Sequence, residues 1–200
     1  LPGWVTVPGG RYLLGAHRSA PFLFDNEKWA HEVVIPPFEI AKAPVTNREF
    51  QNFVDSGGYE NATHWDLEGW AWCQETGARH PVYWQPHCPG NWLIRRFDKS
   101  LPLPLDEPII HVNWHEANAY CRWAGLRLPK EAEWEAAALG EVGPDGNLAP
   151  VKRRFPWGNT PPDPCQANLD GRGLGPVDVA GLPAGDSAFG CRQMLGNVWE

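Results

Sequence analysis

The stretch PIIHVNWHEANAYCRWAGLRLPKEAEWEAAA, residues 108–138, decides the fold. Its pattern predicts a short buried strand over 109–112, followed by two helices with almost no loop between them. Asn113 and Glu116 predict a capping box at the start of the first helix, and Gly125 offers a left-handed stop. The second helix is predicted to begin after Pro129. We expect the rest of the chain to pack around this strand–helix–helix block.

Both predicted helices have a packing side of small and aromatic residues. On the first helix this side consists of Trp114, Ala117, Cys121 and Ala124. On the second helix it consists of Trp134, Ala137 and Ala138, flanked by Glu133 and Glu135. The side of the first helix, small and aromatic together, suits close packing against a sheet.

Two regions before this block predict short strands. Residues 4–14 predict two strands joined by a turn. Residues 31–40 predict another strand, broken at Pro36 and Pro37, because proline cannot donate a hydrogen bond to a neighbouring strand.

A helix and a long aromatic segment are predicted next. Thr46 and Glu49 are predicted to form a capping box at the start of this helix. The helix is predicted to end at Gly57 and Gly58. The residues predicted to face the core are Phe50, Phe53 and Val54. Residues 59–105 predict irregular loops with a short strand or two, and 161–185 predict a series of turns.

Composition narrows the class of protein. The 200 residues suit one domain, with 42% hydrophobic and 20% charged residues, while 21 Gly and 21 Pro predict many turns. The 12 tryptophans predict aromatic packing, with an aromatic ligand cage as the alternative. With a net charge of −7 and no basic run, we expect neither a nucleic-acid partner nor a membrane partner.

The cysteine pattern and the length of the apolar runs indicate the cellular compartment of the protein. The five cysteines are odd in number and lack a C-x-x-C pair, which argues against a disulfide framework or a zinc ribbon. No apolar run approaches the roughly 20 residues of a membrane-spanning helix, and the N-terminus lacks a signal pattern. We therefore expect a cytoplasmic protein.

Several motifs in one order resemble the formylglycine-generating-enzyme (sulfatase-modifying factor) family. They are VPGG near the N-terminus, APVTNREFQNFVDSGGY, the 108–138 stretch, FPWG and the terminal GNVWE. Within that family, FDNEKWAHEV, GWAW and HPVYW resemble the branch found in ergothioneine-type sulfoxide synthases and selenoneine synthases. The resemblance implies an α+β, irregular, C-type-lectin-like fold with low secondary-structure content.

The resemblance also implies a domain organisation and a reaction. In those synthases a DinB-like N-terminal domain supplies the histidines that bind iron(II), and oxygen is used to join a thiol or selenol to trimethylhistidine. Residues 1–200 would be a partial domain, truncated before its distal half and without the iron-binding domain. The catalytic residues and the iron ligands are then expected outside this chain, and the fragment alone is expected to be inactive.

Two histidines have a spacing that suggests a metal site. His111 and His115 form H-x-x-x-H, which on one helix would place both imidazoles on the same face. His111 precedes the predicted cap Asn113, however, so the two rings are expected on different elements. We favour a hydrogen-bonded structural His111 and a partly exposed His115.

The formylglycine branch also implies a structural calcium site. The matching groups are the side chains of Gln193 and Glu200 and the carbonyls of Gly196 and Val198. A companion site would match Asn168 and the Leu169 carbonyl, but the loop after it is shortened here. The alternative, which we favour, is a hydrogen-bonded turn without metal.

Three functions remain open. The first is the substrate-side domain of an iron-dependent oxidoreductase of ergothioneine biosynthesis, acting on trimethylhistidine, a thiol or selenol, and oxygen. The second is a formylglycine-generating oxidase that acts on a sulfatase cysteine. The third is a non-catalytic lectin-like binding module. The GWAW and HPVYW segments favour the first.

Overall fold

The computed structural model describes residues 3–19, 22, 24–88, 90–171 and 173–199. The chain forms two compact units, Leu1–Pro44 with Pro129–Glu200, and Val45–Leu128. We call the first the split unit and the second the central unit. The boundary falls inside the 108–138 stretch, so its two helices belong to different units. The stretch is therefore not the single centre of packing that was expected, because its two helices bury their apolar sides in different hydrophobic cores.

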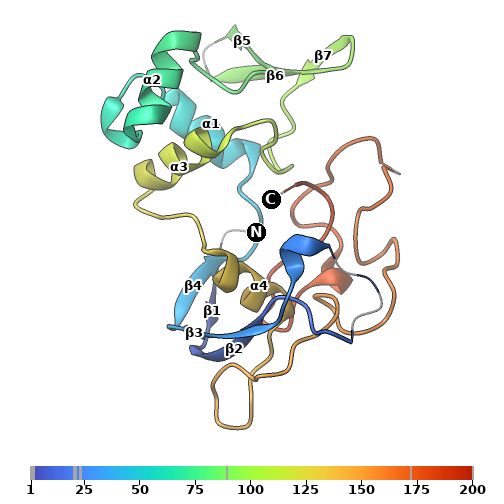
Figure 1. The fold of residues 1–200 in the computed structure, drawn as a ribbon. Coiled ribbons are helices and arrows are strands. Elements are labelled where there is room, and N and C mark those ends of the chain that lie inside the picture. The colour runs from blue at the N-terminus through green and yellow to red at the C-terminus, as the bar shows by residue number, and fades with distance from the viewer. Residues whose placement is uncertain (1–2, 20–21, 23, 89, 172, 200) are drawn as a thin grey trace. The chain divides into compact units, whose positions relative to one another are not determined.

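The central unit contains three helices and one antiparallel sheet (Figure 1). The helices are α1 (Asn47–Asp55), α2 (Leu67–Thr76) and α3 (Trp114–Trp123), with a short 3-10 helix η2 (Ala62–His64). The strands are β5 (Trp84–Cys88), β6 (Asn91–Arg96) and β7 (Lys99–Pro102), in the order β5-β6-β7. Both strand pairs are antiparallel.

Aromatic side chains fill the core of this unit. The Phe50 and Tyr120 rings stack with centroids 5.5 Å apart, and Phe53 contacts Tyr59 and Trp123 at 5.7 and 5.8 Å. The largest rings packed in this core are Trp65, Trp84, Trp70, Trp72, Trp92 and Trp123. Much of the tryptophan content therefore serves packing, as the composition suggested.

The two capping boxes predicted in this unit are confirmed. In α1, Glu49 N–H donates to the Thr46 hydroxyl at 3.2 Å, and Thr46 N–H donates to the Glu49 carboxylate at 2.8 Å. In α3, Asn113 and Glu116 make the same reciprocal pair at 2.9 and 2.7 Å. Gly125, at φ +72°, follows the end of α3 in the left-handed conformation that was expected.

Three predictions for this unit need correction. No strand covers 109–112, because His111 has a left-handed φ of 60° that interrupts the extended chain; an isolated bridge joins Pro108 to Thr46 instead. Helix α3 buries Glu116, Ala119, Tyr120 and Cys121, whereas Trp114 is 61% exposed. Helix α2 was not predicted, because its buried positions, Gly69 and Cys73, are too small to mark an apolar stripe.

The split unit combines short strands with one helix. Strand β1 (Trp4–Val7) pairs with β4 (Phe38–Ala41), and β2 (Gly10–Leu14) pairs with β3 (His31–Ile35), both antiparallel. Helix α4 (Glu131–Leu139) packs on β2 and β3 and buries three successive alanines, 136–138. The predicted strands and the proline break are confirmed, but β1 and β2 pair with other strands rather than with each other.

Turns make up most of 140–199. Phe155 and Gly158 exchange backbone hydrogen bonds at 2.9 and 3.0 Å, which closes the tight turn of FPWG. The split unit also contains two short 3-10 helices, η1 (Asp25–Glu27) and η3 (Pro183–Gly185). No helix in the described residues is long and apolar enough to cross a membrane. The architecture is a mixture of small helices and antiparallel sheets.

Candidate functional site

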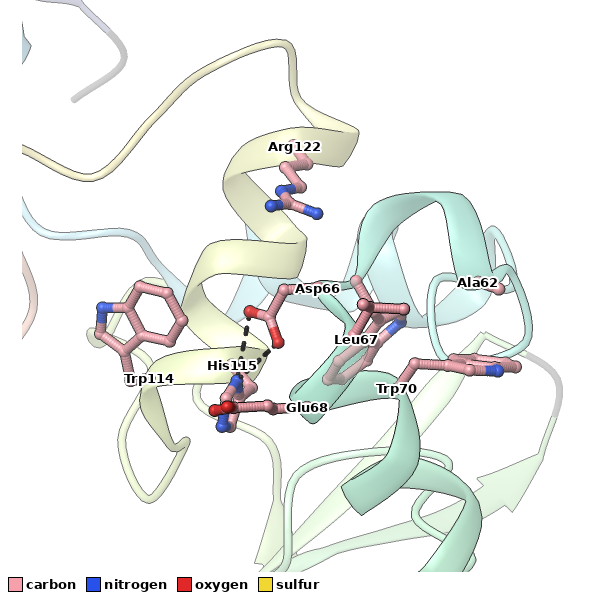
Figure 2. A pocket seen from close by; sticks show the side chains of 9 residues that line it. Ala62, Asp66, Leu67, Glu68, Trp70, Trp114, His115 and Arg122 are labelled. Carbon is pink, nitrogen blue, oxygen red and sulfur yellow. Dashed lines mark hydrogen bonds and ion pairs between the residues drawn. The ribbon is translucent and has the colours of Figure 1, made fainter.

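An open groove lies in the central unit along α2, α3 and the segment before α2 (Figure 2). Its volume is about 660 Å³, within the roughly 300–1,000 Å³ of small-molecule sites. The residues that line it are Ala62, Trp65, Asp66, Leu67, Glu68, Trp70, Trp114, His115 and Arg122. All of them belong to one compact unit.

Asp66 links α2 to α3 in this groove. As the N-cap of α2, its Oδ1 accepts a hydrogen bond from the Gly69 N–H at 2.6 Å. From α3, His115 Nδ1 lies 3.1 Å from Oδ1, and Asn118 Nδ2 donates to Oδ2 at 3.3 Å. These donors favour the charged carboxylate, the Gly69 N–H most of all, and lower the pKa of Asp66 below its usual range.

Gly69 allows the two helices to approach closely enough for these bonds. A Cβ at this position would lie 2.8 Å from the His115 Cβ, a distance that real Cβ contacts essentially never show. The glycine of GWAW is therefore required by the contact with α3, although glycine inside a helix costs roughly 1 kcal/mol relative to alanine. The contact holds His115 beside Asp66 and leaves the ring's Nε2 as the nitrogen available to a ligand.

The groove combines aromatic surface with charges of both signs. Trp114 and Leu67 are 61% and 91% exposed. Glu68, in the first turn of α2, and Arg122, in the last turn of α3, are exposed charged residues among the lining groups. Such a surface can bind a small charged molecule through an aromatic wall and ionic contacts.

Most of this groove was not found in the sequence analysis. His115 and Trp114 were named singly, with Trp114 assigned to the core, and Trp70 entered only as part of the GWAW motif. One signal was present: His115, Asn118 and Arg122 follow a spacing of three and four residues, which places them on one polar face of the predicted helix. Nothing in the sequence shows that Asp66, 49 residues before His115, meets that face.

The two histidines with metal-like spacing lie on different elements, as expected, but the structural role favoured for His111 is wrong, because its side chain is exposed and makes no hydrogen bond with the described residues. His111 precedes the helix cap, and its ring packs edge-on against Tyr83 with centroids 4.8 Å apart. His115 lies in α3 with a side chain that is 26% exposed, so its partial exposure is confirmed. Across the described ranges, no three or more His, Cys, Asp or Glu residues are grouped to hold a metal ion. The described residues therefore do not fit the iron that the family resemblance implies.

Hydrogen bonds connect the residues of the region that was predicted to bind calcium. Gln193 is 4% exposed, and its Oε1 accepts from Asn197 Nδ2 at 2.8 Å. The Gly196 carbonyl accepts from the Val198 N–H at 2.9 Å. Asn168 Nδ2 donates to Asn197 Oδ1 at 3.0 Å. Glu200 lies outside the described residues, so the calcium site stays a prediction.

Comparison with known proteins agrees with this architecture. A family profile described as a sulfatase-modifying factor enzyme 1-like domain matches residues 1–200. The hercynine oxygenase of Mycolicibacterium smegmatis is 45% identical over 197 residues, 98% of this chain and 44% of that protein. The hercynine oxygenase of Mycobacterium tuberculosis is 43% identical over 190 residues, 94% of this chain and 43% of that protein.

A different activity is named for another relative. The formylglycine-generating enzyme of Thermomonospora curvata is 33% identical over 237 residues, 99% of this chain and 70% of that protein. The chain spans less than half the length of the two hercynine oxygenases.

Short helices, small antiparallel sheets and long turn-rich segments define an α+β protein of low secondary-structure content. The profile match over the whole chain is more specific than the architecture. The chain belongs to the sulfatase-modifying factor enzyme 1-like (FGE-sulfatase) family. Both the hercynine oxygenases and the formylglycine-generating enzymes are among its relatives.

Proposed function

We propose that this chain is the substrate-side domain of an iron-dependent synthase that joins a thiol or selenol to trimethylhistidine (hercynine). One observation carries the proposal: identity to two hercynine oxygenases is 45% and 43%, against 33% to a formylglycine-generating enzyme. The relatives support an oxidoreductase role in ergothioneine-type biosynthesis. The C-type-lectin-like form of the fold is part of this proposal.

The proposed reaction balances with one molecule of oxygen. A thiol S–H and the imidazole C–H are replaced by a carbon–sulfur bond, and the sulfur gains one oxygen atom. The second oxygen atom leaves as water with the two displaced hydrogens. When bound, iron(II) would supply the oxygen activation.

The iron ligands are proposed to lie outside these 200 residues. The hercynine oxygenases extend well beyond the matched region, since it is 44% and 43% of their length. In this proposal residues 1–200 are one part of a larger enzyme, completed by a helical iron-binding domain and by the distal part of the family domain. We assign no step of the reaction to a residue of this chain.

The test uses the protein at its full natural length. With iron(II), hercynine, oxygen and either cysteine or selenocysteine, mass spectrometry should detect the coupled product, and a sulfatase-derived cysteine peptide should remain unmodified. Formylglycine in the peptide without coupled product would overturn the proposal in favour of the oxidase. Neither product would favour a non-catalytic role, and one relative of 35% identity over 215 residues is named "Inactive C-alpha-formylglycine-generating enzyme 2" (Mus musculus).

A structural calcium held by Gln193, Gly196, Val198 and Glu200 remains a separate proposal. The hydrogen bond to Gln193 Oε1 would have to be exchanged for a metal contact. Millimolar calcium should therefore raise the melting temperature only slightly. A large increase that Glu200→Gln removes would show that the carboxylate binds the ion.

A further inference from the structure

The turn between β6 and β7 exposes an aromatic side chain in an unfavourable backbone conformation. Arg96 and Lys99 are paired in the antiparallel register, so the loop consists of two residues, Phe97 and Asp98. Phe97 has a left-handed φ of 54°, where hairpin loops of this length usually carry glycine, asparagine or aspartate. The residue is 84% exposed, so burial of the ring does not offset this strain. Strained residues cluster at functional sites, which makes the turn a candidate for contact with a partner.

Two charged residues follow the ring directly. Asp98 is the second residue of the loop and Lys99 begins β7, and both are exposed. Neither side chain makes a hydrogen bond or an ion pair with the described residues. The tip of the hairpin therefore presents an aromatic ring, a carboxylate and an ammonium in three successive residues.

The groove between α2 and α3 presents complementary groups. Its apolar surface is accessible, since Leu67 and Trp114 are 91% and 61% exposed. Glu68 and Arg122 also line it, and neither side chain has a hydrogen-bond or ion-pair partner in the part of the chain that the structure describes. Figure 2 shows these two charged residues at different ends of the lining. The groove thus offers an apolar surface, a carboxylate and a guanidinium, which match the ring, the ammonium and the carboxylate of the turn.

The turn and the groove belong to the same unit but lie at different ends of it. Figure 1 shows the β6–β7 turn on the far side of the central unit from α2. The turn of one copy can therefore reach only the groove of another copy. Such a contact joins two different surfaces, so it can repeat from copy to copy.

We propose that this chain self-associates by inserting the β6–β7 turn of one copy into the groove between α2 and α3 of a second copy. The Phe97 ring packs against the apolar surface of the groove. Lys99 of one copy pairs with Glu68 of the other. Asp98 pairs with Arg122 in the same way. The tip of one hairpin buries less area than a stable interface, so the expected Kd is weak, about 0.1 mM.

Analytical ultracentrifugation of the full natural protein, from about 10 μM to 1 mM, measures the association. We expect the average mass to rise with concentration, and to rise less at high salt because salt screens exposed ion pairs. Phe97→Asn removes the ring but suits the left-handed φ. This variant should therefore melt at a higher temperature while associating about tenfold more weakly, which separates loss of the contact from loss of folding.

A mixing experiment tests which surfaces meet. Trp114→Gln, in the groove, should weaken association as Phe97→Asn does. In an equimolar mixture, the Phe97→Asn copies keep an intact groove and the Trp114→Gln copies keep an intact turn. The mixture should therefore form dimers that grow no further. A mixture that stays as monomeric as its two components would overturn the proposal.

Charge reversal tests the ion pairs. Lys99→Glu should weaken association about fivefold, because it places two carboxylates together. Adding Glu68→Lys to the same protein should restore part of the loss, because the pair forms again in the opposite order. The matched control is Glu75→Lys, which makes the same charge change at an exposed residue of α2 outside the groove lining and should restore nothing. Equal rescue by both lysines would show that only net charge matters, and would contradict the pairing.

This proposal concerns assembly, and it fails or stands independently of the reaction under Proposed function. A protein that remains monomeric up to about 1 mM would overturn it, and the occupant of the groove would then be a small molecule or another part of the full protein. Association that neither Phe97→Asn nor Trp114→Gln alters would overturn it as well. Coupled product in the synthase assay would change neither conclusion, and association with the expected variant pattern would stand without coupled product.

Discussion

Each unit buries a tyrosine that donates its hydroxyl hydrogen bond to a glutamate on a helix, and the two pairs have different surroundings. In the central unit, Tyr59 Oη donates to Glu116 Oε1 at 2.5 Å. In the split unit, Tyr12 Oη donates to Glu135 Oε1 at 3.1 Å, and the Lys152 ammonium pairs with the same carboxylate. Glu116 is 4% exposed, whereas the Glu135 side chain is 19% exposed.

The difference shows how a buried carboxylate depends on its partners. Glu116 accepts hydrogen bonds from two neutral groups, the Tyr59 hydroxyl and the Asn113 N–H. Burial is the largest influence and raises the pKa of Glu116, although these hydrogen bonds oppose it. Glu135 also accepts from two neutral groups, the Tyr12 hydroxyl and the Gly15 N–H, but it is partly exposed and has the Lys152 ammonium as a further partner. The central unit therefore contains a buried carboxyl, Glu116, whose pKa is raised by burial. The split unit contains a partly exposed ion pair, Glu135 with Lys152.

The largest effect is expected from removing the more deeply buried carboxylate. Glu116→Ala should lower the free energy of unfolding by about 3 kcal/mol, because it leaves the Tyr59 hydroxyl unsatisfied and breaks the capping box of α3. Glu135→Ala should cost less, about 2 kcal/mol, because water can reach Lys152. Urea unfolding followed by circular dichroism measures both. Equal losses would mean that the difference in burial has no energetic consequence.

A smaller loss is expected from crowding α2 against α3. Gly69→Ala places a Cβ 2.8 Å from the His115 Cβ, and we expect a loss of about 2 kcal/mol from overpacking. The counterpart in the split unit is Gly10→Ala, whose Cβ would lie 3.0 Å from the Leu148 Cβ. We expect about 1 kcal/mol there, because a loop yields more easily than a helix. Urea midpoints that rank the two variants in the opposite order would contradict this.

Glu116 should also make the central unit less stable as the pH rises. A carboxyl whose pKa is raised on folding binds more protons in the folded state, so its stabilisation is complete below about pH 4.3 and is lost as the pH rises through the raised pKa. The slope cannot exceed about 1.4 kcal/mol per pH unit for one proton. Glu116→Gln should flatten this slope, which urea titrations at several pH values would reveal.

Asp66, in the same unit, is expected to change the stability with pH in the opposite direction. Its pKa is lowered, so its contribution is present above about pH 3.9 and is lost as the pH falls through the lowered value. Asp66→Asn should therefore reduce the loss of stability in acid, without changing the slope that Glu116 produces. If Asp66→Asn instead altered the pH dependence of stability above about pH 5, the lowered pKa assigned to Asp66 would be wrong.

The smallest effect is expected at the helix cap of the split unit. The Lys130 N–H donates to the Glu133 carboxylate at 2.8 Å, which is half of a capping box, but a lysine side chain cannot accept the reciprocal bond. Lys130→Thr should stabilise by about 1 kcal/mol, and Thr46→Ala in α1 should cost a similar amount.

A double-mutant cycle tests whether the cap is responsible. Glu133→Ala should cost more in the Lys130→Thr background than in the native one, because only the substituted protein has a complete box to lose. Chemical denaturation of the four proteins measures the difference. Equal costs, without any gain from the threonine, would show that the start of α4 is not limited by its cap.

The sequence by itself determined the local features and the family. The capping boxes at Thr46 and Asn113 join residues three apart, so they form wherever those helices pack. The proline break after β3 and the tight turn of FPWG are equally local. The motifs that resembled the sulfatase-modifying factor family also led to the family that the profile match shows.

Only the tertiary structure decided which residues meet across long stretches of chain. Asp66 and His115 are 49 residues apart, and Tyr59 and Glu116 are 57 apart. The periodicity of α3 suggested that Trp114 was buried, but the packing of α2 through Gly69 determined which face of α3 was covered. The physical reason is that a cap depends on neighbours within one helical turn, whereas a buried face depends on the element that packs against it.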